Sequence, residues 1–260
     1  MPSPAPPASP SPDLGPWLVR PVPRPDAETV LVTFSHAGAG VACYMPWARR
    51  LSDQVELVSV LLPGREGRFH EPPLQHRALI VRAVAGALGP LRGRRVVFFG
   101  HSLGAMLAFE TAHHLVAHGQ PAPARLILSG RAAPSAPWAS AADLTALPDD
   151  AFVDAMAERY GGIPDAVRAA PALLARFVPA MRADMLLHER YRPAKRSPLP
   201  IPITAWCGRA DPGVREADLA GWREETTESY EERWFDGGHF YLHPAGADWL
   251  AALEGAAARS

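Results

Sequence analysis

Ser102 lies at the centre of a five-residue motif, GHSLG at 100–104, that can present a serine hydroxyl as a nucleophile. The motif follows the apolar run 96–99, typical of a strand, and precedes residues 105–110, which predict a helix. A serine is a weak nucleophile at neutral pH, so it needs a neighbouring base and a rigid, exposed position. A sharp strand-to-helix turn supplies that position, and the flanking glycines let the two elements approach closely.

An acid and a base follow two later strand-like runs. Asp211 comes a short turn after the run 201–207, and His239 comes after the run 230–235 and two glycines. The chain order of serine, aspartate and histidine is that of the α/β-hydrolase triad. We therefore expect His239 to take the proton from Ser102, and Asp211 to fix the tautomer of the imidazole and stabilise its protonated form.

Two other side chains compete for these roles. The chain has ten histidines, so a histidine near the end of the sequence is not by itself informative. His243 is the alternative base and Asp236 the alternative acid. Asp236 stands too close to His239 in sequence to have a strand edge of its own, so Asp211 is preferred.

Stabilising an oxyanion requires preorganised donors, usually backbone N–H groups. Leu103, the residue after the serine, is predicted to supply one, and Ala37 in the glycine-rich segment 34–40 the second. The alternative is that 34–40 is a flexible connector whose glycines only allow a tight turn. A phosphate-binding loop is disfavoured, because the segment lacks GxxxxGK[ST] and has no lysine nearby.

Other polar residues near these motifs have no assigned catalytic role. His101 is predicted to be structural, and His36 to hydrogen-bond the 34–40 segment into shape. The charged residues of 61–68 are open to two interpretations. They either meet a phosphate or carboxylate or pair with one another at the surface, and we favour the surface pairing.

Strand-like and helix-like runs alternate along most of the chain, which predicts an α/β fold with a mostly parallel sheet flanked by helices. Short apolar runs bounded by turn residues predict strands at 29–34, 55–61, 95–99, 125–129, 201–207 and 230–235. Helical patterns cover 44–51, 74–88, 103–118 and 244–257.

Residues 134–200 break this alternation. They carry helical patterns at 149–160, 170–177 and 178–191 and are too long for an ordinary loop. The segment leaves the sheet at the carboxyl end of a strand, the side on which open α/β sheets bind ligands. We expect a helical lid over the serine, inserted within a domain of residues 17–260; a purely structural insertion is the alternative.

Composition excludes several classes of protein. With 260 residues, 48% of them hydrophobic and 20% charged, the chain fits one large globular domain. A net charge of −1 gives no electrostatic basis for binding nucleic acid or an anionic membrane. The two cysteines, Cys43 and Cys207, form no metal-binding cluster and fit free thiols in a reducing compartment.

The first residues differ in composition from the rest. Residues 1–16 are rich in proline, serine and alanine, and they are predicted to form a disordered tail rather than a secretion signal. No stretch is long and apolar enough to span a bilayer. We expect a cytoplasmic protein, with a monomer as the default state.

The motifs together resemble the type II thioesterases, stand-alone α/β-hydrolases associated with polyketide and nonribosomal peptide synthases. The resemblance runs from about residue 29 to 245 and is carried by FSHAG at 34–38, LPGRE at 62–66, GHSLGA at 100–105, GRADP at 208–212 and FDGGHF at 235–240. The HAG and PGRE pieces are the most specific to that family. Ala39 departs from it, because many members have a second glycine there.

The resemblance implies a substrate and a partner. The substrate is an acyl group held as a thioester on the phosphopantetheine arm of a carrier protein, and the reaction removes stalled or wrong acyl units without a cofactor or metal. A carrier protein is expected to be acidic, and the candidate basic residues for docking are Arg20, Arg24, Arg65, Arg68, Arg190 and Arg192.

The apolar residues of the insertion are candidates for an acyl pocket or for the insertion's own core. They are Trp138, Leu144, Phe152, Met156, Phe177, Met181, Met185 and Leu186. Methionine adapts to varied acyl chains, although we expect more than half of these side chains to be core.

Two other functions compete with the thioesterase. One is a small-molecule carboxylesterase or lipase with the same triad, and acyl transfer to an alcohol or amine is a variant of that chemistry. The other is a catalytically silent module that docks on synthases. The silent module predicts a broken triad, whereas this chain presents all three members in order.

Overall fold

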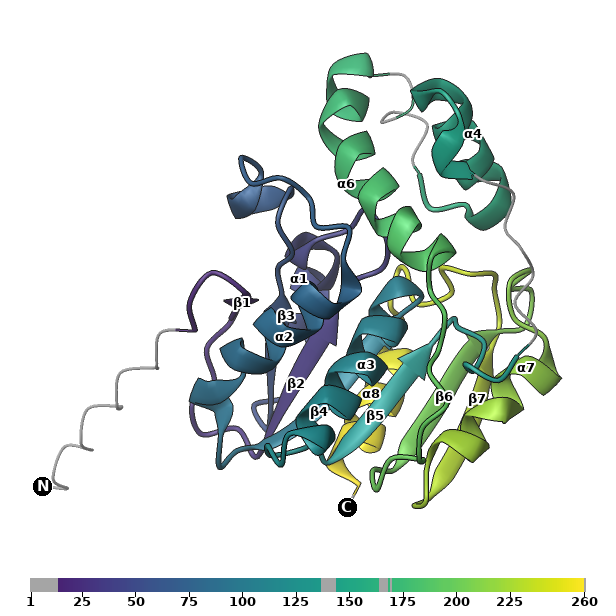
Figure 1. Ribbon diagram of the computed structural model, residues 1–260. Coiled ribbons are helices and arrows are strands. Elements are labelled where there is room, and N and C mark those ends of the chain that lie inside the picture. Colours follow the sequence, from purple (N-terminus) through teal and green to yellow (C-terminus); the bar gives the residue numbers. More distant parts are fainter. Residues whose placement is uncertain (1–13, 137–143, 164–167, 169, 260) are drawn as a thin grey trace, which may run out of the picture.

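The computed structural model describes residues 14–136, 144–163, 168 and 170–259 (Figure 1). Most of the expected tail, 1–16, lies outside these residues, but Leu14 is buried in the main core. Trp138 also lies outside them.

A seven-stranded sheet forms the centre of the molecule, in the order β1-β3-β2-β4-β5-β6-β7. The strands are β1 (Leu18–Val19), β2 (Thr29–Phe34), β3 (Val55–Val60), β4 (Arg95–His101), β5 (Arg125–Ser129), β6 (Ile203–Gly208) and β7 (Tyr230–Phe235). All neighbours pair in parallel except β1, which is antiparallel to β3. The predicted strands are confirmed with shifts of one or two residues at their ends.

Helices cover both faces of the sheet. The α-helices are α1 (Met45–Ala48), α2 (Arg77–Ala87), α3 (Leu103–Ala117), α4 (Asp149–Tyr160), α6 (Pro171–Glu189), α7 (Glu216–Ala220) and α8 (Ala247–Ala258). The 3₁₀ turns are η1 (Val41–Tyr44), η2 (Glu66–Arg68), η3 (Gly89–Leu91), η4 (Leu144–Ala146) and η5 (Gly221–Glu225).

Alternate residues of the central strands enter two separate cores. Val30, Val32 and Phe98 pack with α2 and α3 on one face, whereas Leu31 and Phe99 pack with α1 and α8 on the other. This burial on both faces is why the strands read as continuous apolar runs in the sequence.

The helices α4 and α6, which we call the helical insertion, lie above the carboxyl ends of the strands (Figure 1). Their facing side chains form a third core that includes Phe152, Val153 and Val178. The sequence predicted two helices where α6 is continuous through Pro179. Pro179 has no N–H to donate to the Ala175 carbonyl one turn earlier. Both residues are exposed, so water can take the place of that donor.

Other differences from the sequence prediction are short elements. Strand β1 and helix α7 were not predicted, and the helix expected at 44–51 is the 3₁₀ turn η1 followed by the single-turn α1. Elements this short show too few residues for a hydrophobic period to be visible.

The strand order reverses direction around β2, which lies between β3 and β4. Phe34, the last residue of β2, pairs with Gly100 of β4. The segments that leave these two strands therefore begin side by side, at the position where open α/β sheets bind ligands.

Candidate active site

Ser102 occupies a strained turn between β4 and α3. Its φ of 56° and ψ of −114° lie outside the regions usual for a residue with a side chain, and its N–H donates to the Ser129 carbonyl at 2.8 Å. Among the described residues, only Ser102 and Glu66 combine a side chain with a positive φ. Such strain is held in place by the surrounding structure and is frequent at functional sites.

The glycines of the GHSLG motif are required by close backbone contacts. A Cβ on Gly104 would lie 2.0 Å from the Phe34 carbonyl oxygen, and one on Gly100 would lie 2.3 Å from the Gly104 carbonyl oxygen. The first turn of α3 therefore packs directly against the ends of β4 and β2. This contact fixes Ser102 beside the segment that follows β2.

Asp211 and His239 meet at the carboxyl edge of the sheet. The Nδ1–H of His239 donates to Oδ2 of Asp211 at 2.7 Å, and both side chains are buried. The other carboxylate oxygen of Asp211 accepts the Gly213 N–H at 2.9 Å. An aspartate bound to Nδ1 selects the tautomer whose Nε2 is free to accept a proton.

The competing acid and base lie elsewhere. Asp236 is fully exposed and faces Arg209 at 3.7 Å. The ring of His243 lies 5.8 Å from that of Trp47 and 6.3 Å from that of His36, and burial lowers its pKa. The structure therefore brings Asp211, not Asp236, to the residue that we predicted as the base.

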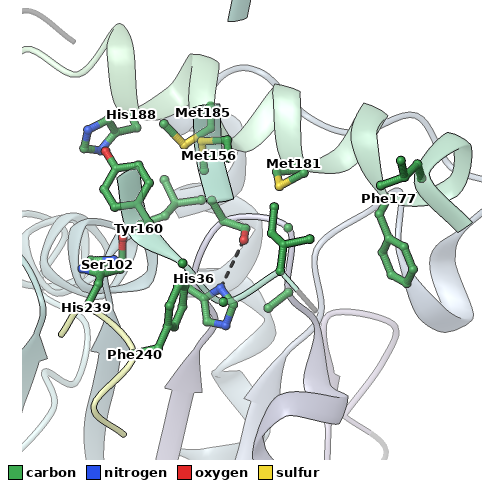
Figure 2. A pocket seen from close by; sticks show the side chains of 18 residues that line it. His36, Ser102, Met156, Tyr160, Phe177, Met181, Met185, His188, His239 and Phe240 are labelled. Carbon is green, nitrogen blue, oxygen red and sulfur yellow. Dashed lines mark hydrogen bonds between the residues drawn. The ribbon is translucent and has the colours of Figure 1, made fainter. Parts of the chain in front are cut away.

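Ser102 and His239 line one mostly apolar cavity of about 250 Å³ (Figure 2). Met156, Met181 and Met185 of the helical insertion form its roof. Of the apolar residues singled out in the insertion, these three and Phe177 line the cavity. The three methionines also belong to the insertion's own core, together with Leu144 and Phe152. The cavity suits a flexible aliphatic group because methionine side chains adapt to varied shapes.

The backbone segment predicted to bind the oxyanion also lines this cavity. Ala37 and Leu103, the two expected donors, lie on its wall with Ser102. The Nδ1–H of His36 donates to the Ala37 carbonyl at 3.1 Å (Figure 2), and burial lowers the pKa of His36 to about 4. A neutral His36 thus holds the segment in shape, as the sequence suggested.

The favoured surface pairing is wrong for the two arginines of 61–68. Arg65 and Arg68 are buried: Arg65 pairs with Asp184 of α6 at 2.7 Å, and Arg68 pairs with Glu71 at 2.6 Å. The carboxylate of Glu66 accepts the N–H groups of Val41 and Ala42. The two arginines need their carboxylate partners because a buried ion needs groups that replace water. Glu66 is exposed, and it supports the neighbouring segment 41–42.

The same burial removes most of the predicted docking arginines from the surface. Arg20 pairs with the fully buried Glu56 at 2.8 Å, and Arg24 donates to the carbonyls of Val55 and Leu51. Only Arg190 and Arg192 of that set remain exposed.

A second cavity of about 560 Å³ reaches Ser102 and His239 from another side. It is lined by four arginines: Arg131, Arg159, Arg192 and Arg215. Arg215 is paired with Asp218 at 2.6 Å, and Arg131 is buried, whereas Arg159 and Arg192 are exposed. The sequence did not reveal this cavity, because its residues come from distant segments.

Tyr160 and His188 of the helical insertion line both cavities. The Tyr160 ring lies 5.1 Å from that of His239, and Arg131 donates to Nδ1 of His188 at 3.1 Å. Burial, together with the nearby charge of Arg131, lowers the pKa of His188 to about 3, so its ring is neutral. The sequence reasoning missed both residues.

His101 is fully buried beneath the site, with Nδ1 2.8 Å from the Ser129 hydroxyl, and burial lowers its pKa. This position agrees with a structural role. Both cysteines are free, and burial raises the pKa of Cys43 to about 12, so its thiol stays protonated.

Across the described ranges, no cluster of three or more histidine, cysteine, aspartate or glutamate side chains is arranged to hold a metal ion. The helices within those ranges include none with the length and hydropathy needed to cross a bilayer.

A mostly parallel sheet that presents serine, aspartate and histidine at its carboxyl edge in this chain order has the architecture of an α/β-hydrolase. The sequence pattern of the thioesterase domain family matches residues 29–251. The chain belongs to this family and is a hydrolase of acyl thioesters.

Individual relatives agree with that assignment. The chain is 35% identical to "Thioesterase PikA5" of Streptomyces venezuelae over 89% of this chain and 82% of that protein. It is 35% identical to RedJ, a thioesterase from the prodiginine biosynthetic pathway of Streptomyces coelicolor, with a TM-score of 0.82 over 90% of this chain and 87% of RedJ. YbtT, a type II thioesterase of the yersiniabactin NRPS/PKS pathway, is 27% identical with a TM-score of 0.81, over 93% and 98% of the two chains.

Proposed function

We propose that this thioesterase hydrolyses acyl groups from the phosphopantetheine arms of carrier proteins and so removes aberrant or stalled units from a polyketide or nonribosomal peptide synthase. The observation that carries the proposal is the meeting of two unlike cavities at Ser102 and His239. The names of RedJ and YbtT, which tie both to such pathways, support it.

The two cavities match the two halves of an acyl-phosphopantetheine thioester. The cavity under Met156, Met181 and Met185 takes the acyl chain, and the helical insertion acts as its lid. The arginine-lined cavity takes the pantetheine arm, with Arg159 and Arg192 as partners for its phosphate. The thioester carbon then lies at Ser102, where the cavities join.

The proposed chemistry proceeds through an acyl-enzyme. Ser102 attacks the thioester carbonyl while His239 takes the hydroxyl proton, and Asp211 stabilises the resulting imidazolium. The C–S bond breaks, and His239 gives the proton to the departing thiolate. Water then attacks the acyl-serine while His239 takes one of its protons; the C–Oγ bond breaks, Oγ of Ser102 receives that proton from His239, and a carboxylic acid leaves.

The negative charge that forms on the carbonyl oxygen needs fixed donors. We assign this role to the N–H groups of Ala37 and Leu103, which lie on the cavity wall beside Ser102. Leu103 is the first residue of α3, so its N–H has no carbonyl partner within the helix. The helix dipole adds to the stabilisation.

The proposed partner is a carrier protein bearing an acylated arm. Arg159 and Arg192 at the opening of the arm cavity favour an acidic partner. The cytoplasmic location and the monomeric state expected from the sequence stay predictions.

The experiment is turnover of an acyl-loaded carrier protein by the wild type and by Ser102→Ala. We expect the substitution to reduce hydrolysis by at least about 1,000-fold. A fluorophosphonate should label the wild type and not the variant. Equal rates of the two proteins would contradict the mechanism, and a free carboxylic ester cleaved faster than the carrier-bound thioester would favour a small-molecule esterase.

A further inference from the structure

Asp184 is a carboxylate of α6 that is buried to 1% exposure yet faces the main domain. Its two oxygens accept three hydrogen bonds: the Gly38 N–H at 2.8 Å, Nη1–H of Arg65 at 2.7 Å and Nη2–H of Arg65 at 2.9 Å. A helix of the insertion is thereby bonded to the backbone segment that follows β2.

Arg65 completes the contact from the other side. Its Nη1 also donates to the Ala39 carbonyl at 2.9 Å, and the guanidinium itself is buried. Asp184 and Arg65 together therefore hold one N–H and one carbonyl of the short segment 37–39. We call these two residues and the segment the loop clamp.

The loop clamp determines the orientation of the peptide groups around Ala37. The Gly38 N–H is held by Asp184, while the carbonyl of the same peptide, that of Ala37, accepts from His36. The preceding peptide is held at the His36 carbonyl, which accepts the Ala39 N–H at 3.1 Å. Because a trans peptide points its N–H opposite to its C=O, the Ala37 N–H is directed away from that bond.

We propose that Asp184 and Arg65 are positioning residues for catalysis, which hold the Ala37 N–H where the oxyanion forms. The proposal rests on the proposed function, because it takes Ala37 as an oxyanion donor. It makes α6 a part of the apparatus that stabilises the transition state, in addition to a cover for the acyl cavity.

The ion pair suits this task because of its burial and geometry. Donors stabilise a transition state best when they already point at the place where the charge develops. The orientation of the loop that carries the donor therefore matters more than the strength of the donor itself. The bidentate contact between the arginine and the carboxylate fixes direction as well as distance. A lysine at position 65 has no second planar donor and cannot reproduce the arrangement.

The test is a comparison of kinetic constants for Asp184→Asn and Arg65→Lys with the wild type. We expect kcat to fall about 10- to 100-fold, because a misplaced donor or group costs about that much. KM for the acyl-carrier substrate should change less than about threefold, since neither residue is proposed to bind it. Binding of a trifluoromethyl ketone analogue, which forms an oxyanion on Ser102, should weaken by the same factor as kcat.

Two control variants separate positioning from general support. Glu56→Gln disrupts another buried ion pair, that with Arg20, near the amino end of β3 and so away from the carboxyl ends of the strands where the site lies. Arg176→Ala removes a second tether of α6, the guanidinium 4.5 Å above the Phe69 ring. Both controls should retain kcat within about twofold at temperatures where they are folded.

Each outcome is decisive. An unchanged kcat in Asp184→Asn or Arg65→Lys overturns the inference, as does an equal loss in the Arg176→Ala control. If Asp184→Asn fails to fold, Arg65→Lys, which keeps the charge, carries the test. A wild type that does not hydrolyse acyl-carrier protein, or is matched by Ser102→Ala, rejects the proposed function instead.

Discussion

The strained backbone of Ser102 depends on residues that have no side chain. Gly100 and Gly104 bring β4, α3 and the end of β2 into direct backbone contact, and the nearest atom to an added Cβ at Gly104 is the Phe34 carbonyl oxygen. Phe34 is the last residue of β2, so the same contact sets the start of the segment with the proposed oxyanion donor. Nucleophile and donor are thus positioned by one packing contact.

Gly104→Ala should therefore disrupt both stability and activity. The Cβ would lie 2.0 Å from a backbone oxygen, so α3 must shift, and overpacking of this kind costs about 1–3 kcal/mol. The matched control is Gly86→Ala, in an exposed position of α2 where an added Cβ meets no atom within 4 Å; it should stabilise by about 0.5–1 kcal/mol. Thermal denaturation of both variants tests this, and a Gly104→Ala protein as stable and active as wild type would contradict it.

His36 should make stability depend on pH. Its folded pKa is about 4 and its ordinary value is 6.5, so as the pH falls below 6.5 the unfolded chain binds a proton that the folded chain excludes. Stability is therefore lost between about pH 6.5 and 4. Compared with His36→Asn, which has no titrating group at this position, the wild type should lose about 1–2 kcal/mol more of its free energy of unfolding between pH 7 and 5. Urea denaturation at both pH values measures the difference, and parallel losses would contradict it.

At the residue scale, the sequence predicted the parts of the site that follow strands. Ser102, Asp211 and His239 each follow the carboxyl end of a parallel strand, β4, β6 and β7 respectively, so the fold brings them to one edge. The sequence did not predict the partner of Arg65, because Asp184 lies 119 residues away and follows another charged residue, Arg182, so nothing local marks it as buried. A charge that is buried only through a tertiary contact looks like a surface charge in the sequence.

At the scale of elements, the sheet was predictable and the insertion only partly so. Strands buried on both faces leave continuous apolar runs that mark them. In α6, one face packs in the insertion's core, another covers the cavity, and Leu173 and Phe177 are exposed, so apolar residues occur around the helix. That pattern, with Pro179 inside it, concealed the length of the helix and which of its other apolar side chains line the cavity.

The position of Met185 on α6 predicts a way to shorten the acyl cavity. Met185→Trp should fill space beneath the helix and reduce kcat/KM for an octanoyl thioester at least about tenfold relative to an acetyl thioester, because each excluded methylene is worth about 1 kcal/mol or more. Leu173→Trp, on the exposed side of the same helix, is the control and should leave the ratio unchanged. Comparable ratios for wild type and Met185→Trp would show that the acyl chain lies elsewhere.

At the scale of the whole molecule, the site lies where the sheet meets the helical insertion. The sheet reverses its strand order at β2 and thereby supplies the segments after β2 and β4 side by side. The helical insertion closes the space above them and divides it at Tyr160 and His188 into an apolar and a basic cavity. The substrate that this division fits has an apolar end, a reactive centre and an anionic end.

The arginines of the basic cavity should therefore contribute to binding only for substrates that carry a phosphate. The double variant Arg159→Ala/Arg192→Ala should raise KM for acyl-carrier protein about 5- to 30-fold, because each exposed charge-assisted contact contributes about 1 kcal/mol. Hydrolysis of an acyl-N-acetylcysteamine thioester, which has no phosphate, should change much less. Arg92→Ala is the matched control, because Arg92 is exposed and precedes β4, at the amino ends of the strands and away from the site. If the double variant hydrolyses both substrates less well by the same factor, the arginines support the fold and the arm enters by another route.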